Sequence, residues 1–138
     1  KHIHFINSKG MLGKIRSMLR PVENCDVSTF ADDKNSKIIQ TKDIQVGDII
    51  TMLGGPDAND RDHIVVIYQI DYQNFVPTKL FYVHSIAYPE DGIYGTGIKK
   101  GSIEIMNSSK GITEQKWTEN NLLIRAQKSK TEVRRMGL

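Results

Sequence analysis

The stretch DHIVVIYQIDYQNFVPTKLFYVHS, residues 62–85, decides the fold prediction for this chain. HIVVIYQID is rich in β-branched and aromatic residues, and LFYVHSIAY repeats that composition after the short polar connection YQNFVPTK. This composition is typical of strands, and a short connection joins antiparallel neighbours. The stretch therefore predicts a β-hairpin that carries His63 on one strand and His84 on the other.

The two histidines are the strongest candidates for chemistry. If the hairpin turns near Gln73 and Asn74, residue 63 pairs with about residue 84, and cross-strand Cβ atoms lie about 4.5–5.5 Å apart. A histidine with a pKa near about 6.5 can act as a general base at neutral pH, and a second polar residue can fix its tautomer. The spacing leaves open a catalytic pair or two strand histidines that bind backbone or water. A zinc site that includes Asp60 or Asp62 is a weaker alternative, because no ligand motif accompanies it.

The sequence on either side of the hairpin extends the fold prediction. Gly47-Asp48 predicts a tight turn before the strand IITML, SIEIMN predicts a further strand, and WTENNLLIRAQ predicts a last strand or helix. Upstream, the apolar spacing from Ile3 to Leu12 predicts a helix, and Asn24 is expected to cap a short helix through DVSTFADD. The predicted fold class is α+β, with an N-terminal helix packed on a short-stranded antiparallel sheet.

Length and charge limit the classes of protein that fit. The 138 residues predict a single domain, residues 1–138, with residues 126–138 as a basic tail. The net charge of +3 is too small to indicate nucleic-acid binding, and KSKTEVRR is expected to form a solvated tail or helix. No apolar run is long enough to span a membrane. The glycines of GIYGTGIKKG do not match a dinucleotide-binding fingerprint, so no cofactor is predicted.

Cysteine content adds a further limit. The single cysteine, Cys25, excludes an intrachain disulfide and a metal site built from several cysteines. The apolar pattern is already under way at Lys1, which leads us to expect a truncated or processed N-terminus. The sequence does not determine the oligomeric state.

Three short motifs occur in the order GDII (residues 47–50), HIVVIY (residues 63–68) and YVHS (residues 82–85). Together they resemble the second half of the NlpC-type cysteine peptidases, which are papain-like and mostly bacterial cell-wall hydrolases. The resemblance covers roughly residues 40–106. It implies a papain-like NlpC-type fold, with His63 as general base and His84 as the residue that orients it.

The resemblance also implies an activity. It predicts thiol-dependent hydrolysis of peptide or amide bonds through an acyl-enzyme, with cell-wall peptide or a peptidoglycan fragment as substrate. It further implies an exported protein that acts in the periplasm, in the cell wall or after secretion. The alternative is a catalytically inactive NlpC-like module that binds peptide or glycan. KDIQVGDIIT also resembles a strand-entry motif of self-splicing Hint-type domains, which is the weakest of the three readings.

The nucleophile is where the sequence departs from that family. The family places its cysteine in a DCS motif at the start of an upstream helix, where the helix N-terminus stabilises the thiolate. This motif is absent from the sequence. KHIHF, residues 1–5, could follow such a motif if it lay immediately before Lys1. Within the chain, Cys25 in ENCDVSTFADD is the candidate nucleophile, and a structural thiol is the other interpretation of this residue.

Overall fold

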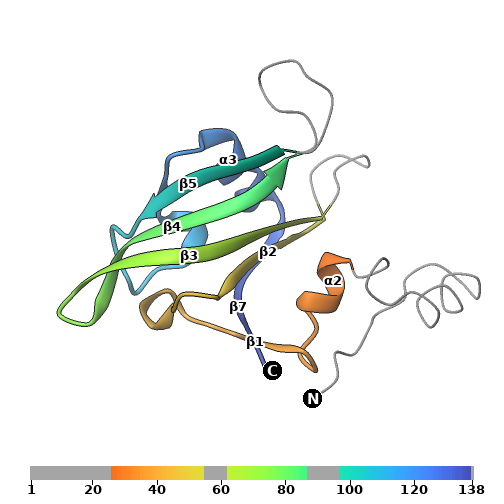
Figure 1. Ribbon diagram of the computed structural model, residues 1–138, viewed down its shortest axis with the longest axis horizontal. Coiled ribbons are helices and arrows are strands. Elements are labelled where there is room, and N and C mark those ends of the chain that lie inside the picture. Colours follow the sequence, from red (N-terminus) through yellow and green to blue (C-terminus); the bar gives the residue numbers. More distant parts are fainter. Residues whose placement is uncertain (1–25, 55–61, 87–96, 138) are drawn as a thin grey trace, which may run out of the picture.

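The computed structural model describes residues 26–54, 62–86 and 97–137. These residues form a curled seven-stranded sheet that has the shape of half a barrel (Figure 1). The strand order is β1-β7-β2-β3-β4-β5-β6, and each neighbouring pair is antiparallel. The central hairpin predicted from residues 62–85 is present as two long strands, β3 and β4.

The elements have the following bounds. The strands are β1 (Ser36–Ile38), β2 (Ile49–Leu53), β3 (His63–Gln73), β4 (Val76–Ile86), β5 (Gly97–Glu104), β6 (Lys116–Trp117) and β7 (Lys130–Met136). The α-helices are α2 (Val27–Phe30) and α3 (Asn120–Lys128), and single 3-10 turns span Thr41–Asp43 and Ile112–Glu114.

The prediction of an α+β, papain-like fold with a helix packed on a short-stranded sheet is wrong, because the described part of the chain is mainly β and its two central strands have 11 residues each. Its one helix longer than a single turn is α3, with nine residues. The expected N-terminal helix falls within residues 1–25, which lie outside the described residues. The short helix expected in DVSTFADD is α2, but its cap within the described residues is Asp26, whose carboxylate accepts a hydrogen bond from the backbone N–H of Thr29 at 3.2 Å. Asn24 lies outside the described residues.

The predicted basic tail is instead an internal strand of the sheet. β7 lies between β1 and β2, and Val133 pairs with Ile50 and is 4% exposed. The charges that indicated a solvated segment have partners from distant parts of the chain. Arg135 donates two hydrogen bonds to the buried carboxylate of Asp48, at 2.8 and 2.9 Å. A charge run is compatible with a strand when its guanidinium groups meet carboxylates in a fixed geometry.

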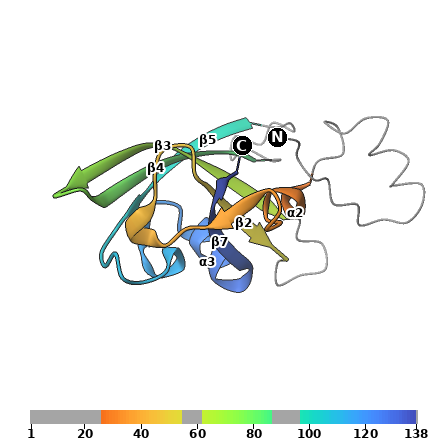
Figure 2. The ribbon, with the colours of Figure 1, turned by 90° about the horizontal axis from the view of Figure 1, so that it is seen from below.

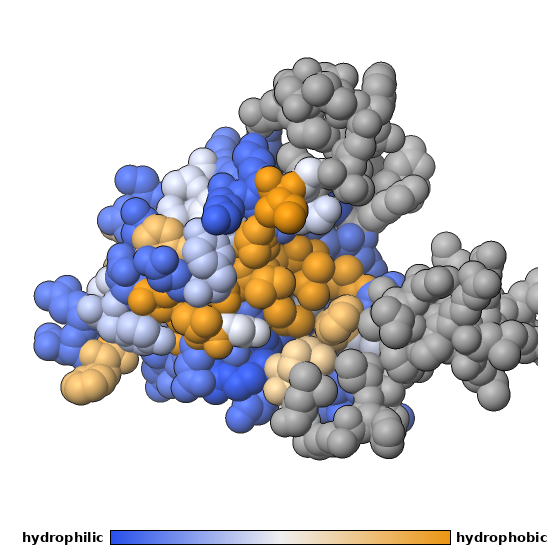
Figure 3. Space-filling view, in the orientation of Figure 1, coloured by the Kyte–Doolittle hydropathy of each residue, from blue (hydrophilic) through white to orange (hydrophobic). Residues whose placement is uncertain are grey.

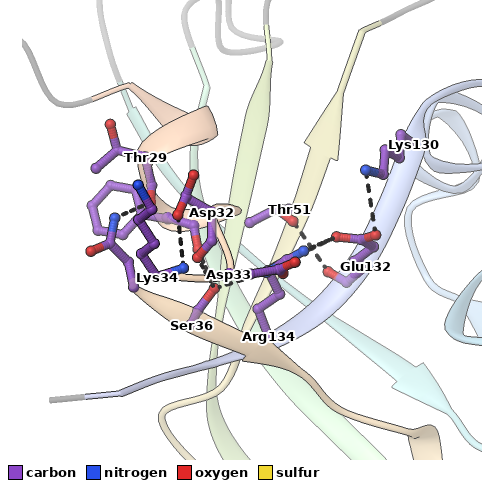
Figure 4. A network of polar contacts seen from close by, with 11 residues as sticks. Thr29, Asp32, Asp33, Lys34, Ser36, Thr51, Lys130, Glu132 and Arg134 are labelled. Atoms are coloured by element: carbon purple, nitrogen blue, oxygen red, sulfur yellow. Dashed lines mark hydrogen bonds and ion pairs between the residues drawn. The ribbon is translucent and has the colours of Figure 1, made fainter. Parts of the chain in front are cut away.

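Arg134 joins the edge of the sheet to the segment around α2. Its side chain is 3% exposed, and Nη1 donates to Asp33 at 3.0 Å and to Ser36 at 3.2 Å (Figure 4). Its Nε donates to Glu132 at 2.8 Å, so the buried charge has two carboxylate partners. Because buried charges are tolerated only when paired, this network holds β1 against β7.

The core lies on the side of the sheet that α3 covers (Figure 2). Trp117 is 6% exposed, and its indole N–H donates to the carbonyl of Ile112 at 3.0 Å. The buried hydrophobic residues of the cluster are Ile39, Ile44, Ile50, Met52, Val65, Ile67, Leu80, Tyr82, Ile103, Ile112, Trp117, Leu122, Ala126 and Val133. This packing fixes the face of β3 and β4 on which the histidines lie.

The opposite face of the sheet carries apolar side chains that are less covered. Val66 and Tyr68 are each 39% exposed, and an apolar area extends over this face of the molecule (Figure 3). They alternate with core residues along β3, as expected for a strand with one buried face. None of the helices in the described ranges is long and apolar enough to cross a membrane.

Candidate functional site

His63 and His84 meet at one end of the central hairpin. His63 opens β3, and its Nε2 lies 2.8 Å from Nδ1 of His84 in β4. The two rings are edge to face, with centroids 5.0 Å apart. His84 is 6% exposed and His63 is partly buried. The structure therefore brings together the two histidines that the sequence selected.

The pairing that brings them together differs from the predicted one. Val66 pairs with Val83, so His84 lies opposite Val65, and His63 is its diagonal neighbour on the same face. The turn is centred on Asn74 and Phe75, both at positive φ, rather than on Gln73 and Asn74. A diagonal neighbour is still within reach of an aromatic side chain.

Two β-bulges determine that the histidines share a face. The register shifts once at Tyr68 in β3 and once at Thr78 in β4, where each residue lacks a cross-strand partner. A single one-residue shift would turn every following side chain to the other face of the sheet. Because the two shifts cancel, His63 and His84 both point to the side that α3 covers.

Glu119 completes the site and was not predicted from the sequence. It directly precedes α3, and its Oε1 accepts the hydroxyl of Tyr82 at 2.8 Å and lies 2.8 Å from Nε2 of His84. Its Oε2 is 3.4 Å from the ammonium group of Lys99. The sequence signals only that Tyr82 and His84 share a strand face, because Glu119 is 35 residues from His84 along the chain.

Gly101 makes room for this contact. It pairs with Tyr82 across β4 and β5, and a Cβ at this position would overlap the phenol ring and its hydroxyl. The ring of Trp117 packs on Tyr82 with centroids 5.7 Å apart. The phenol is therefore held between two neighbours, and its hydroxyl reaches Glu119.

The surroundings of His63 favour the neutral ring. The pKa of His63 is lowered to about 4, chiefly by burial, with smaller contributions from His84 when that ring is protonated and from Arg125, while Glu119 opposes them. Desolvation disfavours the charged imidazolium, and cations nearby do the same. At neutral pH His63 therefore has a nitrogen that is free of a proton.

Glu119 is held in its charged form. Burial by itself would raise the pKa of its carboxyl group, but hydrogen bonds from Tyr82 and His84 and the charge of Lys99 outweigh burial and lower it. Burial, together with the hydrogen bond to Glu119, raises the pKa of the Tyr82 hydroxyl. Tyr82 therefore keeps its proton and remains a donor to an ionised carboxylate.

The other residues predicted for the site divide into two groups. Cys25 and Asp60 lie outside the described residues. Asp62 is described, and its carboxylate accepts the backbone N–H of Gly54 at 2.8 Å, which joins the end of β2 to the start of β3. Within residues 26–54, 62–86 and 97–137, no group of three or more His, Cys, Asp or Glu side chains is placed to hold a metal ion.

A separate hollow of about 450 Å³ lies near the turn of the central hairpin. Phe75 at that turn is 98% exposed, and Arg135 at the wall of the hollow is already bound to Asp48. The remaining lining residues are Lys37, Ile39, Lys42, Asp43, Ile44, Gln45 and Tyr72. No histidine lines this hollow, and His63 and His84 lie at the other end of the hairpin.

No family model, curated protein or solved structure matches this chain. A functional assignment therefore depends on the geometry of the histidine site and on the three short sequence motifs.

Proposed function

We propose that this chain is a thiol-dependent hydrolase of peptide or amide bonds with His63 as its general base. The observation that carries the proposal is the 2.8 Å contact between Nε2 of His63 and Nδ1 of His84. A neutral imidazole held by a second polar group is the base-and-orienter half of a nucleophilic triad. The order of the GDII, HIVVIY and YVHS motifs supports the NlpC-type activity.

The reaction would proceed in two stages. His63 takes the proton of a thiol, and the thiolate attacks the carbonyl carbon of the substrate. The C–N bond breaks as His63 returns that proton to the leaving amine, which leaves an acyl-thioester. His63 then takes a proton from water, the hydroxide attacks the acyl carbon and breaks the C–S bond, and His63 gives the proton to the leaving thiolate, which yields the acid and the free thiol. A thiolate beside His63 would also raise the pKa of its ring, because opposite charges stabilise each other.

The proposed nucleophile is Cys25, the one cysteine of the sequence. The proposed substrate is a peptide of the bacterial cell wall, and the proposed location is outside the cytoplasm. Both follow from the NlpC-type resemblance of the three motifs.

The test is the rate at which iodoacetamide alkylates Cys25 as a function of pH, in the native chain and in His63→Gln. Glutamine keeps a polar group beside His84 but cannot take up a proton. We expect the thiol of the native chain to titrate well below about 8.5, and we expect His63→Gln to remove that shift. A circular dichroism melt of both proteins shows that each is folded.

An ordinary thiol titration in both proteins would overturn the proposal. The chain would then fit the alternative, a catalytically inactive module that binds peptide or glycan. Release of new amino groups from peptidoglycan fragments, measured for the native chain and for His63→Gln, checks the hydrolysis directly.

A further inference from the structure

We propose that Glu119 is a positioning residue that sets the tautomers of both histidines and thereby makes Nδ1 of His63 the basic atom of the site. The catalytic meaning of this proposal depends on the proposed function, but the tautomers themselves do not. Three contacts carry it: Tyr82 to Glu119, Glu119 to His84, and His84 to His63, each at 2.8 Å.

Both carboxylate oxygens of Glu119 face hydrogen-bond donors, which favours the ionised form. Its Oε1 accepts the Tyr82 hydroxyl, and its Oε2 faces Lys99 at 3.4 Å. Its side chain is 15% exposed, so water competes little for these oxygens. An ionised carboxylate has no proton to donate and can only accept. The nitrogen of His84 that faces it must therefore carry a proton.

The charge of Glu119 determines the proton positions on both histidine rings. A neutral imidazole has one N–H and one bare nitrogen. If Nε2 of His84 donates to Glu119, Nδ1 of His84 is bare and accepts the hydrogen bond from His63. Nε2 of His63 then carries the proton, and Nδ1 of His63 keeps its lone pair. The order of donors is fixed from the carboxylate outward.

This order of donors prepares His63 to take up a further proton. When Nδ1 of His63 takes a proton from a thiol, Nε2–H goes on donating to His84, so no other proton has to move. The new positive charge lies one ring away from the Glu119 carboxylate, and opposite charges attract more strongly where water is excluded. Glu119 acts through His84 and does not touch the reacting atoms.

Glu119→Gln is the variant that is expected to reverse this order of donors. Glu119→Gln keeps the shape of the side chain, but one of its two oxygens becomes an NH2 group. Lys99 is a donor and repels the NH2 group, so the amide oxygen is expected to face Lys99. The NH2 group then donates to His84, which must present a bare Nε2. The two tautomers are expected to reverse, and Nδ1 of His63 is expected to carry a proton.

The experiment is proton–nitrogen correlation NMR on the chain with isotope-labelled histidines, at neutral pH. The spectrum distinguishes a protonated ring nitrogen from a bare one. In the native chain we expect His63 and His84 both to be protonated at Nε2. In Glu119→Gln we expect both to be protonated at Nδ1. Tyr82→Phe is the matched control, because it removes one donor to Glu119 but leaves the carboxylate, and it is expected to keep the native tautomers.

Two results would overturn the proposal. One is a native spectrum in which His84 is protonated at both nitrogens, or in which His63 is protonated at Nδ1. The other is a folded Glu119→Gln chain with unchanged tautomers. If this variant does not fold, the native spectrum alone still tests the order of donors.

A second measurement separates this proposal from the proposed function. If Cys25 is activated by His63, Glu119→Gln is expected to slow its alkylation near neutral pH by about 10- to 100-fold, as for groups that orient a functional ligand. Glu119→Asp keeps the charge and is expected to restore part of the rate. Predicted tautomers with an unreactive Cys25 would support the role of Glu119 and refute the hydrolase. A reactive Cys25 together with other tautomers would support the hydrolase and refute the role of Glu119.

Discussion

At His63, the energetic cost of burying a charged imidazole determines how the folded chain responds to acid. The pKa of His63 is about 4 in the folded state, against about 6.5 when the chain is unfolded. Between these values the unfolded state binds more protons, so stability rises with pH. The stability contributed by neutral His63 is present above about pH 6.5 and is lost as the pH falls toward 4.

We therefore predict that the native chain loses more stability than His63→Gln when the pH falls from about 7.5 to about 4.5. Urea unfolding at the two pH values measures the difference. Glutamine does not titrate, so the variant controls for all other acid-sensitive groups. Equal losses in the two proteins would show that His63 is not the group responsible.

Gly101 offers a second test at the scale of one residue. We predict that Gly101→Ala lowers the free energy of unfolding by at least about 2 kcal/mol, because the added methyl group overlaps Tyr82 in a packed core. The displaced phenol would also lose its contact with Glu119, so the pKa of His63 is expected to change. Denaturant unfolding and NMR titration measure the two effects.

Gly111→Ala is the control for this substitution. A Cβ at Gly111 would meet Oε2 of Glu114 at 3.5 Å, which is ordinary van der Waals contact. It is expected to change stability by less than about 0.5 kcal/mol. A similar effect of the two substitutions would count against the close approach of Gly101 and Tyr82.

At the scale of elements, the two bulges of the central hairpin control which face the histidines occupy. We predict that deletion of Tyr68 alone separates His63 from His84, because the remaining shift at Thr78 turns the first half of β3 over. Deletion of both Tyr68 and Thr78 removes both register shifts, so His63 and His84 again share a face and their contact is expected to return. The readout is the pKa of His63 by NMR, or loss of folded protein for the single deletion.

The double deletion is the decisive arm of this experiment. If the double deletion also fails to fold or to give a low pKa for His63, the bulges have a role besides setting the face of the strand. If the single deletion leaves the low pKa of His63 intact, the pairing of β3 with β4 adjusts in another way.

Arg134 gives a prediction for the edge of the sheet. We expect Arg134→Met to lower the free energy of unfolding by roughly 3 kcal/mol, because it leaves Glu132 without its main partner and releases β1 from β7. Chemical denaturation measures this loss. Lys116→Met is the control, since Lys116 is 73% exposed and its 3.9 Å ion pair with Glu104 should contribute little. Equal effects would mean that the Arg134 network does not hold the edge.

At the scale of the whole molecule, β7 joins the edge strand β1 to the rest of the sheet. β7 pairs with β1 on one side and with β2 on the other. We predict that a chain that ends at Lys128 does not fold. The loss of β7 would leave the edges of β1 and β2 unpaired and would remove the buried Val133 from the core. Circular dichroism and solubility measure the outcome. A chain that lacks only Leu138 is the control and is expected to fold.

The sequence by itself determined the central hairpin, the turn before β2 and the choice of the two histidines. The β-branched composition of residues 62–85 was sufficient to predict a hairpin, and Gly47-Asp48 a turn, because strand and turn preferences depend on the residues themselves. His63 and His84 were selected because imidazole is the side chain that titrates near neutral pH. These inferences concern neighbours along the chain, where few arrangements are possible.

Only the tertiary structure decided the fold class, the register and the third member of the site. The segment with the KSKTEVRR charges became strand β7 because its arginines meet Asp33, Asp48 and Glu132, and the first two of these lie far away in the sequence. The bulges at Tyr68 and Thr78 depend on the packing of both strands. Glu119 reaches His84 because α3 begins beside the sheet. Each of these contacts joins distant segments, and local preferences carry no information about which distant segments meet.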